Sequence, residues 1–318
     1  MRHFLSLKDF SKEEILALVN HAKALKQKPE KLLIDKTLAM IFEKNSTRTR
    51  IAFELAITEL GGKALFLNAN DLQLSRGEPL KDTARVIGSM VDFVMLRVNR
   101  HASLEEFAKY SKAPVINALS DLYHPTQILG DLLTMQEYQK EGQIAFVGDS
   151  NNMCNSWLIA ASILGYELSI ALPKNYHIRP EILEFAKEKA KKSGAKITLT
   201  NDKFEAIKDK EVVITDTWIS MGEEEQKEQK IKDFEGFIID KEAMSVAKKD
   251  AILLHCLPAY RGYEVSEELF EAHSEVIFEE ARNRLFVVKA LLCFLEREKN
   301  ERNEKNHSKK TKKCCGTD

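Results

Sequence analysis

A run of hydroxyl and guanidinium side chains, Ser46-Thr47-Arg48-Thr49-Arg50, is the most chemically distinctive stretch of the sequence. It follows an apolar run at 37–42 and opens a helical pattern over 50–60. A helix amino terminus presents free N–H groups and the positive end of a dipole, so it favours an anion. Arg48 adds a planar fork that suits phosphate oxygens. The run predicts a site for a phosphorylated ligand, and the competing interpretation is an ordinary helix cap with surface arginines.

Further polar clusters follow other apolar runs. Ligands of open parallel sheets bind beyond the carboxyl ends of the strands, so we expect these clusters to line one ligand cleft. They are Arg97, His124-Pro125-Thr126-Gln127, Gly148–Asn152, Asp216 with Ser220-Met221-Gly222, and His255-Cys256-Leu257-Pro258.

Several of these side chains have both a chemical and a structural interpretation. Arg97 is either a second phosphate or carbonyl contact or a surface ion pair. His124 can polarise a carbonyl group or act as an acid or base, but a histidine before a helix is also a common structural hydrogen bonder. Cys256 is a nucleophile or a residue that lines the cleft. Met221 contacts a ligand or packs, and Asp216 binds an ammonium group or caps the following loop.

Two absences narrow the chemistry. The loop that begins at Gly148 lacks G-x-G-x-x-G, which weighs against a dinucleotide. No paired-carboxylate or H-E-x-x-H pattern indicates a metal. The residues by themselves therefore predict an α/β enzyme for a small phosphorylated substrate, without a metal or a nucleotide.

Composition agrees with a globular enzyme. The 318 residues carry 48 Lys+Arg against 49 Asp+Glu, so there is no basic excess to indicate nucleic-acid binding. No apolar run approaches the roughly 18 residues of a membrane span, and no secretory signal is visible. The five cysteines lack C-x-x-C spacing, which favours a reducing, cytoplasmic setting.

Strand-like and helical patterns alternate along the chain and position these clusters. We predict two doubly wound parallel-sheet α/β domains joined by interdomain helices. The predicted strands are 37–42, 91–98, 115–119, 144–147, 168–172, 197–200, 212–215 and 251–254. Ser103 and Glu106 form a capping-box pattern for a helix that follows. The predicted domains are 1–135 and 136–280, followed by a C-terminal helix at 281–296 that packs back toward the first domain, and a disordered polar tail at 297–318 without Val, Ile, Leu, Met or aromatic residues.

Taken together, the clusters resemble the aspartate/ornithine carbamoyltransferase family. Ser46–Arg50 is similar to its carbamoyl-phosphate signature, and 124–127 is similar to its second motif. Asp216 with 220–222, and 255–258, resemble the ornithine branch, as do Gln73 and Lys81-Asp82-Thr83-Ala84-Arg85. The resemblance covers about residues 1–295 and leaves out the tail.

The resemblance implies a role for each matching residue. The first domain is expected to bind carbamoyl phosphate and the second to bind ornithine. The residues implied for carbamoyl phosphate are Ser46, Thr47, Arg48, Thr49, Gln73, Arg97, His124, Pro125, Thr126, Gln127, Cys256, Leu257 and Arg284. Those implied for ornithine are Asn152, Asp216, Ser220 and Met221, and the catalytic set is Arg97, His124, Cys256 and Asp216.

The implied reaction transfers the carbamoyl group to the δ-amine of L-ornithine and gives citrulline and phosphate, as in arginine biosynthesis. It requires no metal or organic cofactor. The family also implies a homotrimer, or a multiple of trimers, in which Gln73 reaches a neighbouring subunit's site. The segment 220–236 is charged, and we expect it to close over ornithine as a lid. The alternatives are another amine acceptor such as putrescine, a nicotinamide-dependent dehydrogenase, and a non-catalytic metabolite-binding protein.

Overall fold

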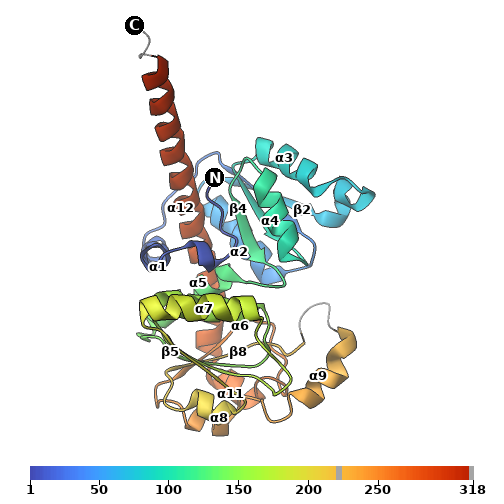
Figure 1. The fold of residues 1–318 in the computed structure, drawn as a ribbon, viewed down its shortest axis with the longest axis vertical. Helices are drawn as coiled ribbons and strands as arrows, with labels where there is room; N and C mark the ends of the chain where they lie inside the picture. Colours follow the sequence, from blue (N-terminus) through green and yellow to red (C-terminus); the bar gives the residue numbers. More distant parts are fainter. Residues whose placement is uncertain (220–223, 315–318) are drawn as a thin grey trace. The chain divides into compact units, whose positions relative to one another are not determined.

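The computed structural model describes residues 1–219 and 224–314, without the side chains of residues 74, 75, 224 and 305–314. The chain divides into two compact units, whose elements are labelled in Figure 1. Unit 1 comprises Met1–Leu5, Asn20–Ser120 and the chain from Leu285 onward, and unit 2 comprises Ser6–Val19 and Asp121–Arg284.

Unit 1 is built on a parallel sheet in the order β2-β1-β3-β4. Ile41, Val94 and Leu96 project from this sheet into a core that also takes Leu104 and Phe107 from α4. The elements are β1 (Thr37–Phe42), α2 (Thr47–Glu59), β2 (Lys63–Asn68), η2 (Ala69–Asp71), η3 (Gln73–Arg76), α3 (Leu80–Met90), β3 (Phe93–Arg97), α4 (His101–Tyr110) and β4 (Val115–Leu119).

Unit 2 has a parallel sheet in the order β7-β6-β5-β8-β9. Its first elements are η1 (Leu7–Asp9), α5 (Pro125–Glu137), β5 (Gln143–Val147), α6 (Asn152–Leu164), β6 (Glu167–Ala171), α7 (Pro180–Ser193) and β7 (Lys196–Thr200). The remaining ones are α8 (Lys203–Ile207), β8 (Val212–Thr215), η4 (Glu224–Gln226), α9 (Lys227–Asp233), α10 (Lys241–Ser245), β9 (Ile252–His255) and α11 (Glu267–Ala272). Two helices have residues in both units, α1 (Lys12–Gln27) and α12 (Ser274–Cys314).

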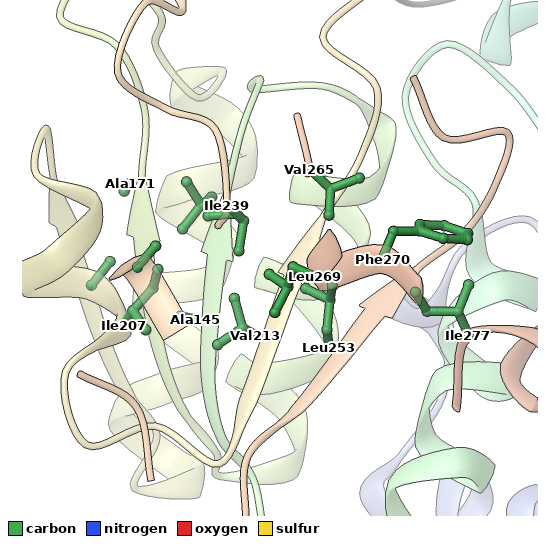
Figure 2. Packing of buried hydrophobic residues seen from close by; sticks show 13 residues of the cluster. Ala145, Ala171, Ile207, Val213, Ile239, Leu253, Val265, Leu269, Phe270 and Ile277 are labelled. Atoms are coloured by element: carbon green, nitrogen blue, oxygen red, sulfur yellow. The ribbon is translucent and has the colours of Figure 1, made fainter. Parts of the chain in front are cut away.

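Figure 2 shows the apolar cluster on one face of the unit 2 sheet. Val213 and Leu253 come from neighbouring strands, and Leu269 and Phe270 of α11 pack with them. Burying one such side chain contributes roughly 1.5–3 kcal/mol. The strands are therefore held at fixed positions, which fixes where the loops at their carboxyl ends begin.

The predicted fold class is confirmed, because both units are α/β with parallel sheets. The strands β1, β4 and β8 have the predicted bounds. The edge strand β2 was not predicted; its pattern is hard to recognise because it exposes Leu65 and Phe66. The capping box at Ser103 is wrong, because α4 already begins at His101, whose Nδ1 lies 2.9 Å from the Oγ of Ser120 on another element.

The predicted C-terminal helix and disordered tail also need correction. The helix α12 runs from Ser274 to Cys314, so residues 297–314 are helical. These residues contain no Gly or Pro and are rich in Lys, Glu and Arg, which favour helix. Extending an existing helix needs no new nucleus, and Arg297 pairs with Glu301 at 3.8 Å. A lack of apolar residues therefore did not make this segment irregular.

The division between the units differs from the predicted boundary after residue 135. Residues 121–135 belong to unit 2. The reason lies in α5, where Thr134 accepts a hydrogen bond from Asn283 and Gln127 donates one to Glu280 within the same unit. Within the described residues, no helix is both long and apolar enough to cross a membrane.

Candidate active site

In unit 1 the hydroxyl and arginine run forms the amino terminus of α2. Ser46 is the N-cap, with extended backbone, and its Oγ accepts a hydrogen bond from the N–H of Thr49 at 3.3 Å. Thr47 is exposed, Arg48 is half-buried and Thr49 is fully buried. The helix-cap interpretation therefore holds for Ser46, and its neighbours present donors at the same helix terminus, which is the arrangement that the predicted phosphate site requires.

Arg97 joins this group from the end of β3. Its side chain is only 5% exposed, and its guanidinium donates to the Oγ1 of Thr49 at 3.4 Å. The pairing of Phe42 with Arg97 aligns the ends of β1 and β3, which explains why two residues distant in sequence meet. Arg97 is thus not a surface ion pair but a buried cation beside a helix terminus, an arrangement that suits an anion.

Gln73 lies apart from this group in the chain. It begins the short helix η3 between β2 and α3, and its side chain is exposed. Its backbone carbonyl accepts from the N–H of Glu78 at 3.1 Å. The segment is therefore ordered locally while the Gln73 amide remains on the surface of unit 1.

In unit 2, His124 precedes α5 and is buried, with Pro125 in the first turn of the helix. The His124 N–H donates to the Oγ of Ser156 at 2.8 Å, and this hydroxyl donates to the carbonyl of Asn152 at 2.6 Å. These bonds tie the amino termini of α5 and α6 together. Asn152 is the first residue of α6 and is half-buried.

Gln127 is completely buried on α5, and its amide is held by two acids. Its Nε2 donates to Asp131 and to Glu280, both at 2.8 Å. Its Oε1 is buried without a hydrogen-bond partner among the described residues, as is the Oγ1 of Thr126. An acceptor in that state is available to a ligand N–H, since a buried polar atom without a partner is costly.

Asp216 follows β8, and both of its carboxylate oxygens are hydrogen-bonded. One accepts from the thiol of Cys256 at 3.0 Å and from the N–H of Thr217 at 2.8 Å. The other accepts from the side-chain amide of Asn151 at 2.8 Å. Asp216 therefore does accept from the start of its own loop, but it also joins β8, the loop before α6 and the loop after β9.

The Cys256 thiol is held in its protonated form. Removal from water and the neighbouring Asp216 carboxylate raise the pKa of this thiol well above its ordinary value, and Glu280 and Asp131 act in the same direction. A nucleophilic cysteine needs a depressed pKa, so the environment opposes covalent catalysis. Cys256 therefore lines the site as a neutral donor.

The turn that carries Cys256 is shaped by His255. The Nδ1 of His255 accepts from the N–H of Leu257 at 2.9 Å, and Nε2 lies 3.1 Å from a carboxylate oxygen of Glu264. Leu257 has a φ of 59°, which an L side chain rarely adopts, so these bonds hold a strained turn.

Asp216, His255 and Cys256 place ligand-type atoms within 4.8 Å of one another. Both ring nitrogens of His255 already have hydrogen-bond partners, however, and the Cys256 thiol is protonated. A metal requires a free imidazole nitrogen and a thiolate. The group is therefore better described as a hydrogen-bonded network.

The structure places the other predicted residues as follows. Arg284 is 3% exposed on α12, one helical turn after Glu280. Ser220 and Met221, and with them part of the expected lid, lie outside the described residues. Farther along that segment, Lys230 of α9 is buried in an ion pair with Asp149 at 2.7 Å.

Several residues of the site were missed by the sequence analysis. Ser156 and Glu264 position other groups by hydrogen bonds that the sequence does not signal, whereas Asn151 lies in the predicted cluster 148–152 without a role assigned to it. Asp131 and Glu280 had a signal, because each lies four residues from a predicted site residue in a helical pattern. That spacing puts each of them on the same helix face as a predicted contact.

These features define an α/β enzyme that has hydroxyl and arginine donors at a helix terminus in one parallel-sheet unit and buried acids in the other. The chain belongs to the aspartate/ornithine carbamoyltransferase family. The model of that family's carbamoyl-P binding domain matches residues 2–137, and that of its Asp/Orn binding domain matches residues 140–295.

The relatives and solved structures to which the chain is similar belong to the same family. The chain is 77% identical over 303 residues to an ornithine carbamoyltransferase of Campylobacter jejuni, covering 94% of this chain and 99% of that protein. A crystal structure of the anabolic ornithine carbamoyltransferase of C. jejuni has a TM-score of 0.93 at 76% identity, covering 94% of this chain and all of the other. The ornithine carbamoyltransferase of Pyrococcus furiosus has a TM-score of 0.87 at 43% identity, covering 92% and 96%.

Proposed function

We propose that the protein transfers the carbamoyl group of carbamoyl phosphate to the δ-amine of L-ornithine, giving L-citrulline and phosphate. The observation that carries the proposal is Asp216, a buried carboxylate fixed by Asn151 and Cys256 immediately before the Ser220-Met221-Gly222 segment. A carboxylate there suits the α-ammonium group of an amino acid. The names of the similar proteins support the same acceptor.

In unit 1 the phosphate is assigned to the amino terminus of α2. The exposed Thr47 and half-buried Arg48 supply donors, and Arg97 with Thr49 adds a buried cation and hydroxyl. Charge builds on the leaving phosphate as the reaction proceeds, and preorganised donors stabilise it. Gln73, exposed on its own segment, is assigned to the site of a neighbouring subunit.

In unit 2 the carbamoyl group is assigned to the segment 124–127, the turn after β9 and Arg284. The Oε1 of Gln127 is an acceptor for the carbamoyl N–H, as are the backbone carbonyls of Cys256 and Leu257. His124 is a donor for the carbamoyl oxygen. Ornithine is assigned to Asn152, Asp216, Ser220 and Met221.

With the substrates bound in this way, the reaction proceeds by direct attack of one substrate on the other. A neutral δ-amine attacks the carbamoyl carbon, and negative charge develops on the carbonyl oxygen. The bond from the carbamoyl carbon to the phosphate oxygen then breaks, and the departing phosphate takes the electron pair and the proton that the amine nitrogen gives up. Because the Cys256 thiol stays protonated, no covalent enzyme intermediate is expected. Orientation of the two substrates can lower such a barrier by roughly 7–11 kcal/mol in favourable cases.

A nicotinamide-dependent dehydrogenase is not favoured by the loop after β5. The side chain of Asn151 caps α6 and accepts from the N–H groups of Met153 and Cys154. A dinucleotide pyrophosphate would need those donors at the helix terminus.

We also propose that the chain forms a homotrimer. Unit 1 exposes apolar side chains on α2 and on the neighbouring edge strand β2, where Ile51, Leu55, Leu65 and Phe66 are 40–52% exposed. An exposed edge strand with apolar side chains tends to be covered by another chain. Sedimentation equilibrium measures the mass directly, and a monomer would contradict the assignment.

An acceptor assay tests the function. The protein is incubated with carbamoyl phosphate and either ornithine, putrescine or aspartate, and each carbamoylated product is quantified. Citrulline is the expected main product. Equal or faster turnover of putrescine or aspartate would show that the acceptor is wrong, and no product with any of the three would contradict the transferase.

A further inference from the structure

Asp131 and Glu280 form a buried carboxyl pair whose oxygens all receive hydrogen bonds. Asp131 accepts from Gln127 at 2.8 Å and from the indole N–H of Trp157 at 3.0 Å. Glu280 accepts from Gln127 at 2.8 Å and from the backbone N–H of His255 at 2.9 Å. Both acids are at most 1% exposed. The pair therefore joins α5, α6, β9 and α12 within unit 2.

The two carboxyl groups are also hydrogen-bonded to each other, which requires a proton between them. Burial raises the pKa of Asp131 to about 6, and burial together with the neighbouring Asp131 carboxyl raises the pKa of Glu280 well above its ordinary value. Arg284 on α12 and Cys256 after β9 are the further ionisable groups that interact with the pair. We therefore describe the pair as carrying a single negative charge.

The pair determines which way the Gln127 amide faces. Both N–H groups of Gln127 point to the acids, so the amide cannot rotate without placing its oxygen against a carboxylate. Its Oε1 is consequently held on the opposite side, buried and without a hydrogen-bond partner among the described residues. An amide at this position without the acids would be free to present either face to a ligand.

We propose that the Asp131–Glu280 pair is a positioning device that locks the Gln127 amide so that its Oε1 accepts a hydrogen bond from the NH2 of the carbamoyl group. Among the proposed carbamoyl contacts in the described residues, Asp131 hydrogen-bonds to Gln127, whereas Glu280 also holds the turn that carries Cys256, through His255. The inference rests on the proposed function, because that function supplies the carbamoyl group.

Asp131→Asn tests the proposal with little change in size. The variant side chain has one acceptor oxygen where Asp131 has two, so it cannot accept from both Gln127 and Trp157, and loss of the bond to Gln127 releases that amide. We expect the Kd for carbamoyl phosphate, measured by titration calorimetry, to rise at least tenfold, with the KM for ornithine changed less than twofold. Glu280→Gln is the second variant and should raise the same Kd.

A double-mutant cycle separates positioning from general damage. In a Gln127→Ala background, Asp131→Asn should change the Kd less than twofold, because the group through which it acts is gone. The matched control is Asn283→Ala, which removes another buried link between α5 and α12, to Thr134 and Glu137. It should lower the melting temperature without changing the Kd.

The outcomes are distinguishable. A carbamoyl-phosphate Kd that is unchanged in both folded single variants, or equal effects of Asp131→Asn with and without Gln127, would overturn the positioning role. Should the wild type bind carbamoyl phosphate but form no citrulline, the proposed acceptor fails while the calorimetric cycle still decides this inference. If the wild type does not bind carbamoyl phosphate, both proposals fail.

Discussion

The helix terminus in unit 1 and the acid network in unit 2 differ in how their residues are assembled. The unit 1 group is mostly contiguous in sequence, from Ser46 to Thr49, and only Arg97 comes from another element. The unit 2 group takes Asp216 from the loop after β8, Cys256 from the turn after β9 and Glu280 from α12. Cys256 and Asn151 donate hydrogen bonds to Asp216, and the N–H of His255 donates one to Glu280. The first arrangement presents positive charge and donors, and the second presents buried negative charge.

This difference follows from the ligands that each group suits. A phosphate needs many donors, and a single helix terminus offers several at once. An amino acid with a reacting amine needs acceptors at defined places, and buried acids must be fully hydrogen-bonded before they can be held there. We therefore expect single changes in unit 2 to cost more than single changes in unit 1.

The largest effect is expected from Asp216→Asn. The change removes the charge that we propose faces the substrate ammonium and turns an acceptor of Asn151 and Cys256 into a partial donor. We expect kcat/KM for ornithine to fall by a factor that corresponds to roughly 2–4 kcal/mol of transition-state free energy. The Kd for carbamoyl phosphate should change little. Asp202→Asn is the control, because Asp202 is an exposed N-cap of α8 and Asn caps equally well. Unchanged kcat and KM for ornithine would show that Asp216 does not contact this substrate.

Arg48→Ala should have the next largest effect. The change removes one guanidinium group but leaves Arg97 and the helix terminus in place. We expect the turnover of carbamoyl phosphate to fall at least tenfold, because a lost charged hydrogen bond costs roughly 1.5–3 kcal/mol. Arg50→Ala is the matched control in the same helix, since Arg50 pairs with Glu54 at 3.5 Å and lies over the ring of Phe66. It should change turnover less than threefold. Equal losses in the two variants would mean that the run acts as a general basic surface.

A smaller, chemical effect concerns Cys256. Its raised pKa lowers the fraction of thiolate, and only the thiolate reacts with alkylating reagents. At pH 8 we expect mass spectrometry to find that iodoacetamide modifies Cys256 much more slowly than in the urea-unfolded chain. Asp216→Asn should speed the reaction, because it removes a negative charge that raises the pKa. Rapid modification of the folded wild type would contradict the neutral thiol.

The smallest effect is expected from deleting residues 303–318. The side chains of residues 301–304 are exposed, so those at the start of the deleted segment, residues 303 and 304, bury little surface. Activity and melting temperature should stay the same, while circular dichroism should lose a little helical signal. A melting temperature lower by several degrees would show that the end of α12 stabilises the fold.

The sequence by itself determined most of the buried strands and the polar residues that end them. Apolar runs such as 37–42 and 212–215 predicted strands with the observed bounds, because a buried strand of a parallel sheet is apolar on both faces. The predicted anion site at Ser46–Thr49 was also visible in the sequence, since helix capping and donor geometry are local properties. The motif at 255–258 was visible as a family resemblance, without any account of why His255 belongs to it.

Only the tertiary structure decided the network around Gln127 and Asp216. Asp131 and Glu280 are 149 residues apart, taking 280 minus 131, and nothing in either neighbourhood indicates that they share a proton. The protonation of Cys256 and the orientation of the Gln127 amide likewise depend on groups brought together by packing. Hydrogen bonds and pKa values respond to distance and burial in space, and the order of residues along the chain does not specify these quantities.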